Sequence, residues 1–119
     1  MSFPIPPLTR EQARLLSPLQ LAFVGDAVHA LMVRAGTALK NLNVHDMHLQ
    51  ATGKVNAVSQ AKAMQAVFPL LTEEEQQIAL RGRNAHAHHG APKAATAQQY
   101  AWATGLEALF GWLYLRDDL

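Results

Sequence analysis

The sequence contains no cysteine, only 7% aromatic residues and no long hydrophobic run. The absence of cysteine excludes disulfide bonds, zinc–thiolate sites and thiol nucleophiles, and it suits a reducing cytoplasm. No apolar stretch approaches the roughly 20 residues that a membrane-spanning helix needs. Residues 1–8 have neither a basic segment nor a continuous apolar one, so they do not look like a signal peptide. We therefore expect a cytoplasmic protein with no membrane association.

Charge is also scarce, at 16% of residues, and the formal net charge is only +1. A nucleic acid would therefore be held by a local basic patch rather than by the whole surface. Half of the 119 residues are hydrophobic, which is enough for one domain with a real core. Abundant alanine with few aromatic side chains favours closely packed helices over sheets.

Capping signals divide the chain into about six helices and indicate no strand, so the predicted fold is all-α. We expect an extended lead-in over residues 1–8 and a single domain over residues 9–119. The first predicted helix is short and follows the capping box of Thr9 and Gln12, and the second runs from Pro18 to about Ala35 with Gly36 as its C-cap. The third covers residues 44–55, and the fourth is capped by Asn56 and ends before Pro69. The fifth runs from the capping box of Thr72 and Glu75 to about Arg83, and Thr96 caps the sixth, which continues through Leu115.

Two further features complete the predicted organisation. Residues 84–95 contain Gly90 and Pro92 and are predicted to form a loop. An apolar stripe before it is predicted to belong to the core; its members are Ala61, Met64, Ala66, Val67 and Phe68.

Asp26 and Glu107 are each the only charge in an otherwise apolar helical run. Neither has a lysine or arginine three or four residues away, where a helical neighbour would pair with it. A carboxylate on an apolar face costs several kcal/mol unless a cation or hydrogen bonds compensate it. A bound metal ion would compensate both, although capping of a neighbouring helix or pairing with a distant arginine would also do so.

Glycines accompany both acidic residues. Gly25 directly precedes Asp26, and Gly111 follows Glu107 by one helical turn. Small residues there would let two helices approach until both carboxylates reach one ion. They are equally well explained as ordinary helix-packing glycines.

Several spaced motifs resemble the catalytic domain of the ribonuclease III family. The run from Phe23 to Val28 is similar to its signature helix, and the run from Glu107 to Leu115 is similar to its second catalytic helix. Segments between them resemble the short branch called Mini-ribonuclease III, which lacks a double-stranded-RNA-binding domain; they are Arg81 to Ala85, Pro92–Lys93, and Tyr100 with Ala103 to Gly105. The resemblance covers roughly Leu15 to Leu115.

This resemblance implies a Mg²⁺-dependent endonuclease, with Mn²⁺ as a substitute, that cuts double-stranded RNA as a homodimer and leaves 5′-phosphate ends. Its implied substrate is the precursor of large-subunit (23S) ribosomal RNA. Asp26 and Glu107 are the implied catalytic residues and metal ligands. Two further acidic positions of classical ribonuclease III are Ala22 and Thr104 here, as in the short branch.

The same resemblance points to Arg81, Arg83, Asn84 and Lys93 as the RNA-binding segment. The forked guanidinium group of arginine and the ammonium group of lysine are suited to contacts with RNA phosphates. Positively charged side chains near the C-terminus of a helix are also explained by their favourable interaction with the helix dipole. The predicted dimer interface is the apolar signature helix, through residues 19, 23 and 24.

Alternatives remain for the histidines and for the function. His86, His88 and His89 look like a metal tract but fall in the predicted loop, where a solvated or RNA-facing role suits them better than zinc binding. His45–Asp46 suggests another all-α metal-dependent phosphohydrolase family, with His29 and Asp117 as unsupported further ligands. His48 occupies a position typical of the short branch, which a packed helix histidine also explains. The alternative function is a non-catalytic helical module that binds RNA or a ribosomal partner.

Overall fold

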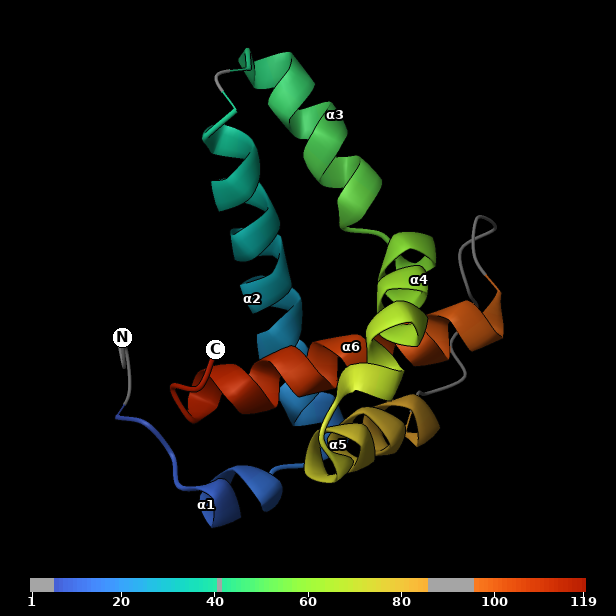
Figure 1. The fold of residues 1–119 in the computed structure, drawn as a ribbon. Coiled ribbons are helices and arrows are strands. Elements are labelled where there is room, and N and C mark those ends of the chain that lie inside the picture. The colour runs from blue at the N-terminus through green and yellow to red at the C-terminus, as the bar shows by residue number, and fades with distance from the viewer. Residues whose placement is uncertain (1–5, 41, 86–95) are drawn as a thin grey trace.

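The computed structural model describes residues 6–40, 42–85 and 96–119, and within them every regular element is a helix. The elements are α1 (Arg10–Arg14), α2 (Pro18–Ala38), α3 (Val44–Lys54), α4 (Ala57–Val67), a 3₁₀ turn (Phe68–Leu70), α5 (Glu73–Asn84) and α6 (Ala97–Leu115). The all-α prediction of about six helices is confirmed (Figure 1).

Helix α6 lies at the centre of the fold, where α2, α4 and α5 all contact it (Figure 1). It is apolar nearly all round, as a helix surrounded by others must be. Trp112 on α6 is almost completely buried. The core cluster joins α6 to the other helices and consists of Ala13, Leu21, Ala22, Met64, Ile78, Ala79, Leu106, Ala108, Leu109, Trp112 and Leu115.

The helix starts are fixed by local hydrogen bonds, and the boxes of α1 and α5 are the two that the sequence predicted. At α2, the Gln20 backbone N–H donates to Ser17 Oγ over 3.1 Å, and the Ser17 N–H donates to Gln20 Oε1 over 2.8 Å. Reciprocal boxes of the same kind begin α1, α5 and α6. Each box satisfies backbone donors that the first turn of a helix leaves without partners.

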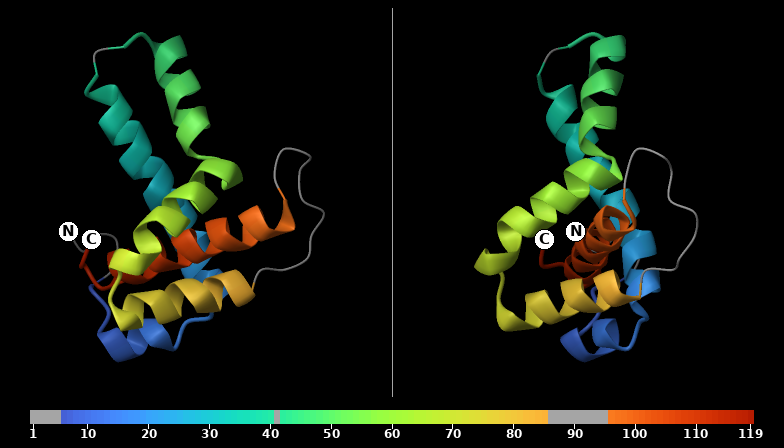
Figure 2. Two further views of the ribbon diagram at one scale, coloured as in Figure 1. Left: turned by 45° about the vertical axis from the view of Figure 1, so that its right-hand side comes forward. Right: turned by 90° about the vertical axis from the view of Figure 1, so that its right-hand side faces the viewer.

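The second half of α2 and the whole of α3 form a projecting hairpin, which we call the α2–α3 arm and define as residues 30–55. Two views show the arm standing away from the bundle around α6 (Figures 1 and 2). No residue of α3 is buried. The arm therefore owes little of its position to core packing.

Three details of the predicted organisation are wrong. Gly36 is not a C-cap, because α2 continues to Ala38 and ends at Leu39. Asn84 belongs to the last turn of α5 rather than to the loop. Ala66 and Val67 are exposed, whereas Ala61 and Met64 are in the core and Phe68 packs against it.

The lead-in is tied to the last helix at its described end. The Leu8 backbone N–H donates to the Leu115 carbonyl oxygen over 2.7 Å. Over the described residues, no helix has both the length and the apolar character required to cross a membrane.

Candidate active site

Asp26 on α2 and Glu107 on α6 lie side by side, close enough for the Asp26 carboxyl group to raise the pKa of Glu107. The two residues are 81 positions apart in the chain and meet only because α2 crosses α6. Glu107 is half-buried as expected, but Asp26 is exposed, which corrects the prediction that both lie on a buried apolar face. Asp26 is therefore open to a substrate, and Glu107 forms the inner wall of the site.

Close backbone contact between the two helices brings these side chains together. A Cβ on Gly25 would overlap the backbone carbonyl oxygen of Glu107, and one on Gly111 would overlap the carbonyl oxygen of Leu21. No residue larger than glycine fits at either position without moving a helix. The two roles considered for these glycines, helix packing and bringing the carboxylates together, therefore coincide, because the packing of α2 on α6 is what places the carboxyl groups side by side.

The electrostatics of the pair are unfavourable without a cation. Burial, the hydrogen bond with Asp26 and the negative charge of Asp26 together raise the pKa of Glu107 from 4.5 to about 8. With its pKa at about 8, Glu107 keeps its proton at neutral pH beside the Asp26 carboxyl group. Among the described residues, neither carboxylate forms an ion pair with a lysine or arginine, so the distant-arginine alternative gains no support there.

The two positions that are acidic in classical ribonuclease III contribute no ligand here. Ala22 is buried, and so is Thr104, whose Oγ1 donates to the Tyr100 carbonyl oxygen over 2.9 Å. Within the described ranges, no cluster of three or more His, Asp or Glu side chains is arranged to hold a metal ion. The candidate metal centre is therefore the Asp26–Glu107 pair alone, a donor set that suits Mg²⁺ with several water ligands.

His29 is a neighbour of the site whose role sequence reasoning missed. Its ring stacks on Phe110 with centroids 5.4 Å apart, and its Nδ1 is 3.0 Å from Gln60 Nε2. Burial lowers the pKa of His29, and the negative charge of Asp26 opposes that shift. Its place one turn after Asp26 was visible in the sequence. Nothing in the sequence, however, linked it to Gln60 on α4.

The predicted RNA-binding residues differ in their exposure and in the residues they contact. Arg81 is exposed in the last turn of α5. The Arg83 guanidinium lies 4.8 Å from the Trp102 ring centroid, and its Nε–H donates to Asn84 Oδ1 over 3.1 Å. Arg83 therefore contacts Asn84 and Trp102 on α6, as a residue that stabilises the end of α5 would. Lys93 lies outside the described residues, as do the histidines at positions 86, 88 and 89.

The His45–Asp46 pair does not form the centre of another phosphohydrolase site. Asp46 lies in the first turn of α3, where its backbone N–H donates to Asn43 Oδ1 over 2.8 Å and its Oδ2 accepts from Asn43 Nδ2 over 3.1 Å. His45 is exposed beside it. Neither joins a three-ligand group in the part of the chain that the structure describes.

Comparison with known proteins places this arrangement in a family. A ribonuclease III domain matches residues 19–118. Mini-ribonuclease 3 of Thermoanaerobacter sp. is 45% identical over 112 residues, covering 93% of this chain and 78% of that protein. The chain belongs to the Mini-ribonuclease III branch of the ribonuclease III family. Mini-ribonuclease 3 of Symbiobacterium thermophilum is 46% identical over 101 residues, covering 84% of this chain and 77% of the relative.

The fold agrees with this membership. A crystal structure of a Fusobacterium nucleatum protein superposes with a TM-score of 0.77 at 33% identity, covering 86% of this chain and 81% of that one. As a member of the Mini-ribonuclease III branch, the protein is an endoribonuclease. The matched segment includes both Asp26 and Glu107.

Proposed function

We propose that the protein is a Mg²⁺-dependent endoribonuclease that cleaves double-stranded RNA as a homodimer, with Asp26 and Glu107 as its metal ligands and catalytic residues. The observation that carries this proposal is the pair of carboxyl groups that the close contact of Gly25 with the Glu107 backbone brings together, with the Glu107 pKa raised to about 8. A divalent cation would replace the proton on Glu107 and remove the repulsion between two ionised groups. A module that only bound RNA would have no use for such a costly pair.

The two carboxylates would have separate tasks during cleavage. When bound, Mg²⁺ (or Mn²⁺) supplies an activated water and stabilises charge on the phosphate oxygens. Asp26, which is exposed, would meet the incoming phosphate, whereas the half-buried Glu107 on α6 would hold the ion from the inner side. Glu107 must lose its proton before it can act as a ligand. The products are RNA ends with a 5′-phosphate and a 3′-hydroxyl.

An exposed apolar surface on α2 supports the homodimer. Phe23 is 83% exposed and Leu31 is 67% exposed, and both line a groove of about 540 Å³ that also contains Asp26. Leu19 is 45% exposed beside them, while Val24 packs against the core. Apolar patches of this kind mark protein interfaces. A two-fold dimer through this face would place two sites with the symmetry of two antiparallel RNA strands.

The segment from Arg81 to Lys93 is the proposed RNA-binding segment outside the carboxylate pair. Arg81, being exposed, is suited to direct phosphate contact. Arg83 would hold the last turn of α5 against Trp102 and donates to Asn84. The proposed substrate is the precursor of 23S ribosomal RNA in the cytoplasm, and the proposed catalytic domain comprises residues 9–119 after the lead-in of residues 1–8.

The test is incubation of the purified protein with structured precursor ribosomal RNA, in Mg²⁺ and in EDTA. We expect discrete cuts in both strands of a stem in Mg²⁺, 5′-phosphate ends on the products, and no cut in EDTA. Asp26→Asn serves as the matched control. RNA binding without any metal-dependent cut, over a range of salt concentrations, would instead support the non-catalytic binding module.

A further inference from the structure

The α2–α3 arm is positively charged although the whole protein is nearly neutral. Its basic residues are Arg34, Lys40 and Lys54, and its one carboxylate, Asp46, is engaged by Asn43 at the start of α3. By contrast, α5 begins with Glu73, Glu74 and Glu75. Because α3 buries no residue in the core, the charge on the arm serves no visible packing purpose.

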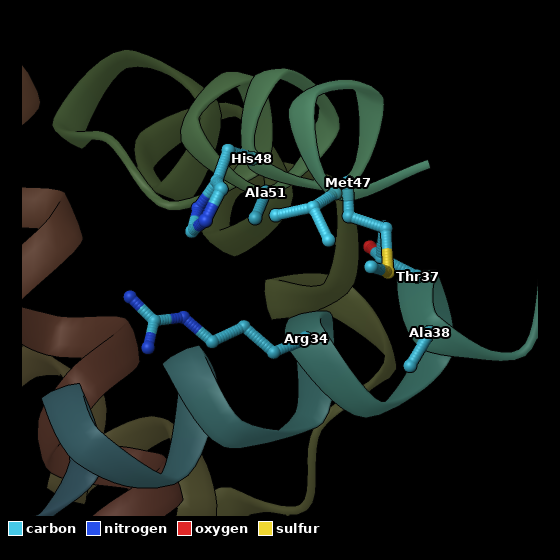
Figure 3. Close-up of a pocket in the computed structure, with 7 residues that line it drawn as sticks. Arg34, Thr37, Ala38, Met47, His48 and Ala51 are labelled. Atoms are coloured by element: carbon cyan, nitrogen blue, oxygen red, sulfur yellow. The ribbon is translucent and has the colours of Figure 1, made fainter. Parts of the chain in front are cut away.

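Arg34 and His48 stand on opposite walls of a cleft inside this arm. Arg34 extends from α2, and its guanidinium reaches the same end of the cleft as the imidazole of His48 on α3 (Figure 3). Both residues line two adjoining cavities, of about 230 Å³ and about 160 Å³. No acidic residue lines either cavity, and among the described residues no carboxylate pairs with Arg34.

A second basic cluster lies farther along the arm. Lys40 Nζ donates to Gln50 Oε1 over 3.3 Å. Hydrogen bonding and charge repulsion from the Lys54 side chain lower the pKa of Lys40. Two exposed ammonium groups this close to each other raise the positive potential along the arm and favour a polyanion.

We propose that the Arg34–His48 cleft binds a backbone phosphate of duplex RNA, at a fixed distance from the cleavage site. Arg34 follows Asp26 by eight residues on the same helix, so their backbones are separated by about 12 Å. Ala30, one turn after Asp26, already lines the cleft. The bound phosphate therefore belongs to a nucleotide a few steps from the scissile bond. This inference rests on the proposed cleavage of double-stranded RNA.

Phosphate suits the chemistry of the cleft better than a base would. Arginine presents a fork of N–H donors that matches two phosphate oxygens, and a histidine adds a further donor. Duplex RNA hides its base edges in a deep, narrow major groove and exposes phosphates and 2′-hydroxyls. A cleft that contacts the backbone would set the register of the duplex against Asp26 and Glu107 without reading sequence.

Binding measurements on Arg34 variants test the proposal. In a Glu107→Gln background, which prevents cutting, the affinity for a duplex RNA is measured against salt concentration. We expect Arg34→Ala to weaken binding several-fold and to lower the slope of log affinity against log salt by about 1. Arg34→Lys should keep most of the slope while losing part of the affinity. Arg14→Ala, which removes one exposed positive charge from α1 at the other end of the molecule, is the matched control (Figure 1).

A phosphate scan locates the contact. Replacing single phosphates by neutral methylphosphonates should weaken binding at one position per strand in the background protein, and that position should lose its effect in the Arg34→Ala variant. If Arg34→Ala folds poorly by circular dichroism, Arg34→Gln gives the same comparison.

The outcomes separate this proposal from the proposed function. Arg34→Ala behaving like Arg14→Ala, in a protein that still cuts duplex RNA in its wild-type form, would overturn the cleft alone. A wild-type protein that neither binds nor cuts duplex RNA would overturn both proposals.

Discussion

Gly25 lies so close to the backbone carbonyl of Glu107 that a Cβ on Gly25 would overlap the carbonyl oxygen. This contact fixes α2 and α6 against each other at the position of the acidic pair. Asp26 comes next in the chain and Glu107 carries the other carboxyl group, so the spacing of the candidate metal ligands is set by backbone packing. Side-chain flexibility contributes little to it.

Substitutions of these glycines should therefore damage stability and site together. We expect Gly25→Ala or Gly111→Ala to lower the free energy of unfolding by about 3 kcal/mol or more, because overpacking against backbone atoms cannot be relieved by a rotamer change. Gly36→Ala is the matched control, since a Cβ there has nothing within 4 Å and Gly36 is inside α2. It should stabilise by about 0.5–1 kcal/mol. Urea denaturation measures all three, and an unchanged midpoint for Gly25→Ala would contradict the packing argument.

Neutral isosteres of the two acids should separate catalysis from folding. Asp26→Asn and Glu107→Gln keep the size of each side chain but remove the anionic ligand. We expect cleavage of a stem-containing RNA in Mg²⁺ to fall by orders of magnitude, with the helical circular dichroism spectrum retained. A variant that cut at nearly the wild-type rate would show that its residue is not a metal ligand.

The raised pKa of Glu107 predicts an unusual dependence of stability on pH in EDTA. Between its ordinary value of 4.5 and about 8, the folded protein holds a proton on Glu107 that the unfolded chain has lost. The folded state then binds more protons, so the free energy of unfolding falls as pH rises through this interval. The contribution of Glu107 is fully present below pH 4.5 and is lost above about pH 8; its size is on the order of a few kcal/mol.

Glu107→Gln isolates this effect from that of His29. Burial lowers the pKa of His29, so its contribution has the opposite sign and is lost as pH falls below about 6.5. Subtracting the pH profile of the Gln variant from that of the wild type leaves the Glu107 part. Urea denaturation from pH 5 to 9 provides both profiles, and a difference that does not change with pH would refute the raised pKa of Glu107.

The sequence was most informative where structure depends on local interactions. Capping boxes at Thr9 and Thr72 predicted helix starts because each involves residues three positions apart. Helix ends were less predictable. The glycine at position 36 was expected to end α2, but the helix continues past it, and no other described part of the protein lies within 4 Å of the place where its Cβ would be. The exposure of Asp26 and the contact of His29 with Gln60 depend on how helices distant in sequence cross, which no local pattern encodes.

The apolar face of α2 should hold the proposed dimer together. Phe23→Asp places a charge in that face and should convert the protein to a monomer at micromolar concentration, because a buried unpaired charge costs several kcal/mol. Leu70→Asp is the control, since Leu70 is also 84% exposed but lies on the 3₁₀ turn. Sedimentation velocity gives the oligomeric state. A wild-type monomer that still cuts both strands in one encounter would rule out the dimer.

The two arginines at the end of α5 should give different results despite their proximity in the sequence. Arg81 is exposed, so Arg81→Ala should leave the free energy of unfolding within about 0.5 kcal/mol of wild type. It should weaken RNA binding and lower the salt slope by about 1, as expected for one lost phosphate contact.

Arg83 stacks on Trp102 and donates to Asn84. Arg83→Ala should therefore cost about 1 kcal/mol of stability through the lost cation–π contact and packing. Arg83→Lys keeps the charge but loses the flat guanidinium, so it should remain destabilised while its salt slope stays near that of wild type. Thermal unfolding and salt titration of duplex RNA binding, run on the three variants in parallel, decide the assignment. Equal stabilities with equally reduced salt slopes for Arg81→Ala and Arg83→Ala would mean that both arginines contact the substrate and that the Trp102 contact contributes nothing to the fold.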